Sequence, residues 1–245
     1  KIAASKNQKV LLVEQENVIG GSILSSNNHN NKISGKSQTE WKNIVLEELN
    51  KLENIKIITD TTLFAYMHYN YLLAIQDLQP SKGKDKKNSI RQIVWKIRAK
   101  KVILATGSIE RPLTFNNNDR PGIMLANSAS KYLNGYGVNL GKNIVIFTNN
   151  DSAYQTAIDF HNQNINVAAI VDVRKNLEGD LPTKVKNLGI KIHTGSIISN
   201  TKGRKKIQTV HIKKINQENV EILNCDLLCM SGGWSPTVHL FTQSR

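Results

Sequence analysis

Ala105-Thr106-Gly107-Ser108-Ile109-Glu110-Arg111-Pro112 is the stretch that decides the fold, and it directly follows the apolar run Val102-Ile103-Leu104. A β-branched run that ends in a small residue, a threonine and a glycine is typical of a buried parallel strand. Small residues at the end of such a strand let a ligand approach the backbone closely. Ligands of open α/β sheets lie beyond the carboxyl ends of the strands. The stretch therefore predicts an α/β sheet with a ligand at Ala105, Thr106 and Gly107.

A second strand with a carboxylate at its end lies upstream. The run Lys9-Val10-Leu11-Leu12-Val13 is followed by Glu14, and Gly20, Gly21 and Ser22 come shortly after. In a dinucleotide fold, an acid at this place binds the ribose hydroxyls, and a Gly-Gly turn leaves room for a phosphate. Taken singly, the acid is an ordinary polar strand end and the glycine pair an ordinary loop. In this order, together with Ala-Thr-Gly, they predict a dinucleotide site.

The glycine-rich G-x-G-x-x-G turn that normally opens a dinucleotide fold is missing from the chain. The chain begins at Lys1 without Met, and Ile2 to Lys6 is typical of the end of a crossover helix. We expect a first strand and its phosphate loop to lie before Lys1, and we interpret the chain as an internal part of a longer polypeptide.

Composition limits the possible functions. The chain has 245 residues, of which 39% are hydrophobic, and these values are typical of one large or two smaller globular domains. The net charge of +14 is scattered, and the densest lysine cluster, residues 82–87, is interpreted as a solvated loop. No nucleic-acid-binding module accompanies the charge, and no apolar run is long enough to cross a membrane. We therefore predict neither a nucleic-acid nor a membrane partner.

Only two cysteines occur, Cys225 and Cys229, and they are predicted to be buried thiols on a strand. Two buried thiols suit a reducing compartment, so we predict a cytoplasmic protein. Their spacing is not C-x-x-C, and a zinc site needs more ligands than this pair offers. The sequence contains no convincing catalytic acid–base pair and no nucleophile elbow, so no catalytic residue and no metal site are assigned.

The first half of the chain is predicted to form a dinucleotide-binding domain with an inserted antiparallel meander. Ser37-Gln38-Thr39-Glu40 forms a capping box that opens a helix to about Leu52. The other elements expected there are strands at 55–59, 62–67, 71–78 and 90–98.

The second half is predicted to repeat the strand–helix–strand pattern. We expect a short helix that is capped by Asn127 and runs to Tyr136, a strand at 142–147, a helix at 151–162 and a strand at 167–174. Further strands are expected at 190–198, 208–215 and 220–230. The turn Thr148-Asn149-Asn150-Asp151 has no glycine, so we do not expect this unit to bind NAD(P) in the usual way. The interpretation preferred for Asp151 is a helix N-cap.

These elements predict an α/β protein with two Rossmann-like units of the three-layer β/β/α type. The expected domains are 1–112, 113–228 with a degenerate glycine loop, and 229–245, where the chain returns to the first domain. The turn Ser231-Gly232-Gly233-Trp234-Ser235-Pro236 marks that return. We expect Gly232 and Gly233 to touch a bound cofactor, although a Pro/Gly turn that ends a strand is the simpler alternative.

Three segments carry a resemblance to a known family. They are 105–126, which includes Asn118-Asp119-Arg120-Pro121-Gly122-Ile123-Met124, then Phe147 to Tyr154, and Ser231 to Phe241. In these segments the chain resembles the α subunit of heterotetrameric sarcosine oxidase. The resemblance covers nearly the whole chain and is strongest from Val102 onward.

The resemblance implies a flavin-dependent oxidase that acts on CH–NH donors with oxygen as acceptor. It implies NAD in the first nucleotide domain of this subunit, FMN near the interface with the β subunit, and FAD and tetrahydrofolate elsewhere in a complex with β, γ and δ subunits. Sarcosine would be demethylated to glycine, with hydrogen peroxide and methylenetetrahydrofolate or formaldehyde as products. Cofactor contacts are expected at Thr148, Asn149, Asn150 and Arg111, with solvent-exposed loop residues as the alternative.

Two other functions stay open at this point. One is an α-like subunit of a proline or opine dehydrogenase, which belongs to the same class of enzymes. The other is a non-catalytic scaffold whose nucleotide is purely structural.

Overall fold

The computed structural model describes residues 1–26, 32–78 and 90–244. Two compact units divide the chain. The first unit takes residues 1–23, 28–107 and 236–245, and the second takes 24–27 and 108–235. The predicted boundaries at 112 and 228 stay predictions. The lysine-rich segment 82–87, interpreted as a solvated loop, lies outside the described residues.

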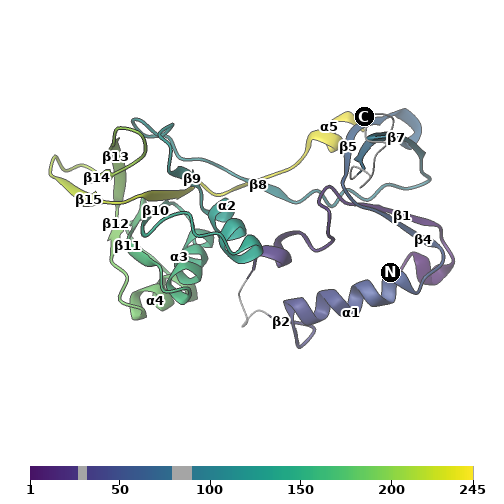
Figure 1. Cartoon of the computed structure of the whole chain (residues 1–245), viewed down its shortest axis with the longest axis horizontal. Coiled ribbons are helices and arrows are strands. Elements are labelled where there is room, and N and C mark those ends of the chain that lie inside the picture. The colour runs from purple at the N-terminus through teal and green to yellow at the C-terminus, as the bar shows by residue number, and fades with distance from the viewer. Residues whose placement is uncertain (27–31, 79–89, 245) are drawn as a thin grey trace, which may run out of the picture. The chain divides into compact units, whose positions relative to one another are not determined.

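The second unit is built on a five-stranded parallel sheet in the order β12-β11-β10-β16-β9. Figure 1 labels β9, β10, β11 and β12 of this sheet. Every strand of this sheet lies parallel to its neighbours, so the connections between them must cross over a face of the sheet. The bounds are β9 (Ile123–Leu125), β10 (Asn143–Thr148), β11 (Asn166–Asp172), β12 (Ile192–Thr194) and β16 (Leu227–Ser231).

Different layers cover the two faces of this sheet. Helices cover one face, and a three-stranded antiparallel sheet covers the other. The helices are α2 (Ala126–Ser130), α3 (Ser152–Asn162) and α4 (Asp180–Asn187), and the antiparallel strands are β13 (Ser196–Lys202), β14 (Thr209–Lys214) and β15 (Val220–Asn224). The predicted three-layer β/β/α architecture is therefore confirmed for this unit.

Alternate residues of the central strands enter different cores. On β10, Ile144 and Ile146 pack among the helices, whereas Val145 and Phe147 pack against the antiparallel strands. All four are at most 3% exposed. Both faces of the strand are covered, which explains why its sequence is an unbroken apolar run rather than an alternating one. The two cysteines also lie in different cores. Cys229 is on β16 and belongs to the helical core, whereas Cys225 precedes that strand, outside any regular element, and belongs to the other core, so the prediction of a strand is wrong for Cys225.

The first unit contains a short parallel pair, β1 (Val10–Val13) and β4 (Ile55–Ile58), connected through α1 (Gln38–Asn50). The predicted cap of α1 is confirmed, because the Ser37 hydroxyl accepts a hydrogen bond from the Glu40 N–H at 3.2 Å. The Glu40 carboxylate accepts a hydrogen bond from Lys36 at 3.2 Å. A small hairpin of β2 (Lys32–Ile33) and β3 (Lys36–Ser37) precedes the helix.

The predicted meander is confirmed as an antiparallel sheet in the order β5-β6-β7. Its strands are β5 (Thr61–Met67), β6 (Tyr71–Asp77) and β7 (Gln92–Arg98). The C-terminal helix α5 (His239–Gln243) packs against this sheet, where Gln243 Oε1 accepts a hydrogen bond from the Tyr66 N–H at 3.0 Å.

The strand predicted at Val102-Ile103-Leu104 is wrong for this structure. These residues have no regular secondary structure, and Ile103 is 88% exposed. A strand exists only where a neighbour satisfies its backbone groups, and within the described residues no other strand pairs with this segment. The chain instead forms β8 (Ser108–Glu110) slightly later, and β8 pairs with β17 (Trp234–Pro236).

The helix expected to start at Asn127 begins one residue earlier, at Ala126, and Asn127 is not its cap. The N–H of Asn127 donates to the buried Glu110 carboxylate at 2.8 Å. The carboxylate therefore satisfies a free N–H of the first helical turn from outside the helix. The helix continues as a π-helical turn from Lys131 to Gly135.

Candidate functional site

Glu14 lies where the sequence predicts it, directly after β1 at the carboxyl end of the parallel pair. Its N–H donates to Ile58 O at 2.9 Å, and its carbonyl accepts from Thr61 N at 2.9 Å. The carboxylate accepts a hydrogen bond from the Glu16 N–H at 3.0 Å through Oε1. The backbone around Glu14 is thus fixed on both sides, and the acid stands at the edge of the sheet where a ribose diol would be bound.

The Gly-Gly turn takes up a compact form. Gly20 and Gly21 both have positive φ angles, 148° and 52°, and Gly21 begins a 3-10 helix that runs to Ser25. A Cβ atom added to Gly21 would meet nothing within 4 Å. The backbone therefore needs glycine for its conformation, and the space beside Gly21 is open to an approaching group.

Thr106 and Gly107 bind the chain's C-terminal segment. The Thr106 hydroxyl donates to Thr237 O at 2.7 Å, and the Thr237 N–H donates to Gly107 O at 3.0 Å. Ala105, Thr106 and Gly107 are exposed, and the space beside the α-carbon of Gly107 is open. The turn can therefore be approached from solvent, but the Thr106 hydroxyl already has a partner. Thr237 lies in the segment Ser231 to Phe241 that carries the resemblance, but sequence reasoning assigned it no role.

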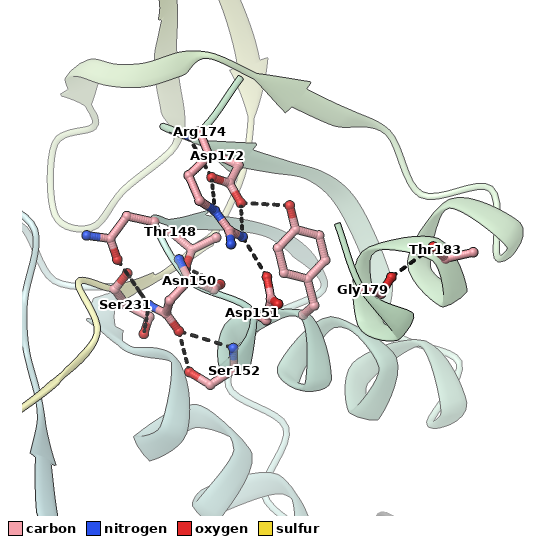
Figure 2. Close-up of polar contacts among 11 residues, drawn as sticks. Thr148, Asn150, Asp151, Ser152, Asp172, Arg174, Gly179, Thr183 and Ser231 are labelled. Atoms are coloured by element: carbon pink, nitrogen blue, oxygen red, sulfur yellow. Dashed lines mark hydrogen bonds and ion pairs between the residues drawn. The ribbon is translucent and has the colours of Figure 1, made fainter. Parts of the chain in front are cut away.

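In the second unit, three strand ends meet in register. Thr148 at the end of β10 pairs with Asp172 of β11 on one side and with Ser231 of β16 on the other. All three side chains are buried. Figure 2 shows them grouped together at the carboxyl edge of the sheet, around the turn that leads into α3. This edge is where ligands of α/β sheets bind.

Asn150 connects the end of β16 to the start of α3 through its side-chain amide. Its Nδ2 donates to Ser231 Oγ at 3.0 Å and to Ser231 O at 3.2 Å, and its Oδ1 accepts from the Ser152 N–H at 3.1 Å (Figure 2). The Ser152 hydroxyl donates to the same Oδ1 and accepts from Trp234 Nε1 at 3.0 Å. Asn149, by contrast, is exposed, and its Oδ1 accepts from Asn150 Nδ2 at 3.1 Å.

Asp172 and Arg174 form the second half of the edge. Arg174 binds the fully buried Asp172 carboxylate through Nε at 3.1 Å and Nη2 at 2.8 Å, and Nη2 also lies 2.8 Å from Asp151 Oδ1 (Figure 2). The Tyr154 hydroxyl donates to Asp172 Oδ2 at 2.8 Å. Burial, followed by the hydrogen bond to Asp172, raises the pKa of Tyr154 well above its usual range. The hydrogen bonds to Asp172 likewise raise the pKa of Arg174.

Sequence reasoning missed Asp172, Arg174 and Tyr154. A usable signal was present, because Asp172 ends an apolar β-branched strand in the same way as Glu14 does. The expectation that Asp151 caps α3 is right about position and wrong about chemistry. Asp151 precedes the helix, but its side chain makes no cap hydrogen bond and faces Arg174 instead. Asn150 Oδ1 takes the N–H of the first turn.

Gly232 has a packing role in the structure. Its N–H donates to Arg111 O at 2.7 Å, and the Arg111 N–H donates to Gly233 O at 2.8 Å. A Cβ atom on Gly232 would lie 2.8 Å from Pro112 O and 3.0 Å from Arg111 O, so a side chain does not fit. The space beside Gly233 is open, with φ at +90°. Arg120 donates to Thr201 Oγ1 at 3.4 Å and to Gly203 O, which fixes it beside the β13–β14 hairpin.

The two thiols are buried. Burial raises the pKa of Cys225 to about 12 and also raises that of Cys229. They occupy different cores and are unpaired. Across the described residues, no group of three His, Cys, Asp or Glu side chains is placed to hold a metal ion, and no helix there is long and apolar enough to span a bilayer.

Comparisons with known proteins agree with this geometry. The chain is 33% identical to sarcosine oxidase subunit alpha of Corynebacterium sp. (strain U-96) over 99% of its length, and 32% identical to that of Rhizobium meliloti (strain 1021) over 97%. It covers 26% and 23% of these relatives, so it spans about a quarter of their length.

Solved structures share the fold. Thioredoxin reductase from Lactococcus lactis matches with a TM-score of 0.72 at 19% identity, covering 98% of this chain and 74% of that one. L-proline dehydrogenase from P. horikoshii matches with a TM-score of 0.64 at 21% identity, covering 96% and 39%. The family model described as pyridine nucleotide-disulphide oxidoreductase matches residues 1–245. The chain therefore belongs to the pyridine nucleotide-disulphide oxidoreductase family, whose α/β fold binds FAD and NAD(P).

Proposed function

We propose that this chain is part of the α subunit of a flavin-dependent sarcosine oxidase and that it binds NAD. The observation that carries the proposal is the similarity of nearly its whole length to proteins named sarcosine oxidase subunit alpha. The reaction is the oxidative demethylation of sarcosine to glycine, with oxygen as acceptor. The oxidising flavin lies outside this chain, which agrees with the lack of a catalytic acid–base pair in the sequence.

The NAD site belongs to the first unit. Glu14 binds the adenosine ribose, and the backbone at Gly20, Gly21 and Ser22 passes beside the nucleotide. Ala105, Thr106 and Gly107 form the opposite side. The residues fit a nucleotide, because the acid follows a parallel strand and the spaces beside Gly21 and Gly107 are open.

The FMN contact is proposed for the second unit, at its surface toward the β subunit. The exposed side chains of Arg111 and Asn149, with the open backbone at Gly233, are the groups that reach a flavin or its phosphate. Thr148, Asn150 and Gly232 shape this surface from beneath, because their polar groups are already bonded within the unit. FAD, tetrahydrofolate and the γ and δ subunits belong to other parts of a cytoplasmic complex.

The test is turnover by the complete complex purified with its cofactors. We expect peroxide formation with sarcosine and little with proline, together with bound NAD⁺ that stays oxidised during turnover. Turnover with proline but not sarcosine would assign the chain to a proline dehydrogenase instead. Reduction of the bound NAD⁺ by sarcosine would contradict the expectation that it stays oxidised.

A further inference from the structure

Three N–H groups of the turn between β10 and α3 are bonded within the protein. Dinucleotide folds bind the pyrophosphate through free backbone N–H groups at this helix N-terminus. Here the Asn149 N–H donates to Ser231 O at 3.3 Å, the Asn150 N–H to Thr148 Oγ1 at 3.0 Å, and the Ser152 N–H to Asn150 Oδ1 at 3.1 Å. Three donors of the turn therefore have protein partners before any ligand arrives.

Asp172, the acid that would bind a ribose in this unit, is already hydrogen-bonded to protein groups. Asp172 ends β11, the place of the ribose-binding carboxylate in a dinucleotide fold. Its Oδ1 accepts from the N–H and Nε of Arg174, and its Oδ2 accepts from Arg174 Nη2 and the Tyr154 hydroxyl. A carboxylate has about four acceptor positions. Asp172 is also fully buried, so a ribose diol has neither access to it nor an acceptor left.

Charge opposes a nucleotide at the same edge. The trio of Asp151, Asp172 and Arg174 carries two negative charges and one positive, and the guanidinium lies 2.8 Å from an oxygen of each carboxylate. An arginine after this strand could otherwise pair with a phosphate. A pyrophosphate at this turn would meet a net negative site and would have to break a bidentate ion pair.

We propose that the second unit is a dinucleotide fold closed by its own side chains, with Asn150 in place of the pyrophosphate and Arg174 closing the ribose end. The hydrogen bonds of Asn150 and Ser152 have a structural role instead. Asn150 binds Ser231 (Figure 2). Ser152 accepts a hydrogen bond from Trp234, so the two residues together fix the turn that follows β16. The inference goes beyond the NAD site proposed for the first unit and does not depend on it.

Nucleotide stoichiometry tests the closure. The complete subunit, stripped of nucleotide, is titrated with NAD⁺, NADH and NADPH, as wild type and as the Glu14→Gln and Arg174→Gln variants. We expect Arg174→Gln to bind as many equivalents of nucleotide as the wild type does. An equivalent that survives Glu14→Gln and is lost in Arg174→Gln would overturn the inference. A wild type that binds nothing would refute the proposed NAD site while agreeing with the closed second unit.

Stability without nucleotide gives an independent readout. Asn150→Ala removes the bonds to Ser231 and Ser152, so we expect the Tm of the nucleotide-free subunit to fall by about 4 °C or more. Asn149→Ala is the matched control, since its side chain is exposed and accepts a hydrogen bond from Asn150, and the Tm should change by about 1 °C or less. If Asn150→Ala does not fold, Asn150→Asp, which keeps the acceptor for Ser152 and loses the donor to Ser231, should have a lower Tm than wild type. Equal Tm values for wild type and Asn150→Asp would overturn the inference.

Discussion

Thr106 and Thr237 are 131 positions apart in the chain and are joined by a 2.7 Å hydrogen bond from the Thr106 hydroxyl to the Thr237 carbonyl. The Thr237 N–H returns a bond to Gly107 O. The Ala-Thr-Gly turn is therefore held by the C-terminal segment of the same unit, and its shape depends on that segment being in place.

Thr106→Val should lower the free energy of unfolding of the first unit by about 0.5–1.5 kcal/mol, because it deletes one hydroxyl donor and leaves the Thr237 carbonyl without that partner. Urea denaturation of the nucleotide-free protein measures the change. Thr106→Ser keeps the hydroxyl and should restore most of the loss. Thr237→Val is the matched control, since only the backbone of Thr237 takes part. A loss as large in Thr237→Val as in Thr106→Val would show that packing, not the bond, is responsible.

Glu14→Ala should weaken NAD⁺ binding by the complete subunit by about 1.5–3 kcal/mol, or roughly 10- to 150-fold in Kd, because a charge-assisted bond to the ribose is lost. Isothermal titration calorimetry measures it. Glu16→Ala is the nearby control, because Glu16 lies two residues further from the strand end. An unchanged Kd in Glu14→Ala would remove the ribose assignment.

Alanine variants of Gly122 and Gly137 distinguish steric overlap from backbone strain. Both have positive φ, 92° and 65°. A Cβ on Gly122 would lie 2.7 Å from Ile207 Cγ2 and 3.1 Å from Asp226 O, whereas one on Gly137 would meet nothing within 4 Å. We expect both alanine variants to lose about 1 kcal/mol to strain and Gly122→Ala to lose a further 1–3 kcal/mol, roughly, to overlap. Equal losses by thermal denaturation would contradict the close approach of Gly122 to Ile207.

Asp159 makes the stability of the second unit depend on pH. It is 3% exposed and accepts hydrogen bonds from Asn134 and Gln155, each at 2.8 Å. Burial is the largest effect on its pKa and raises it, while the hydrogen bonds lower it. The folded state thus favours the protonated form. The resulting stabilisation is complete below the ordinary aspartate pKa, about 3.9, and is lost as pH rises through the higher pKa of the folded state.

We therefore expect the stability of wild type relative to Asp159→Asn to fall as pH is raised from about 4 through the raised pKa, and then to level off. Thermal denaturation of both proteins across this pH range measures the difference in stability. The contributions of other titrating groups, such as Glu110, are the same in both proteins and cancel in that difference. A difference that does not vary with pH, or that rises with pH, would contradict the raised pKa.

The sequence predicted most of the second unit because its strands are apolar on both faces and its helices have clear boundaries. The run Asn143 to Thr148, the helix after it and the strand to Asp172 all appear within one or two residues of expectation. The capping box at Ser37 and the meander were also predicted, since both depend on local residue patterns.

Other features depend on partners that no local pattern reveals. Val102-Ile103-Leu104 has the composition of a strand, but composition does not supply a neighbour to pair with. Asp151 has the residue type of an N-cap, yet Arg174, 23 positions later, attracts its carboxylate. The bond between Asn150 and Ser231 spans 81 positions and arises only because β10 and β16 are adjacent.

The two cores on opposite faces of the five-stranded sheet each hold one cysteine. Cys229 is sealed under the helices and Cys225 under the antiparallel sheet, at 0% and 3% exposure. A thiol-modifying dye should therefore label Cys229 when the helices separate from the sheet, and Cys225 when the antiparallel strands do. The chain thus carries one natural probe on each side of a single sheet. Labelling rates of the two cysteines, resolved by mass spectrometry, would measure the local opening rates of the two layers separately.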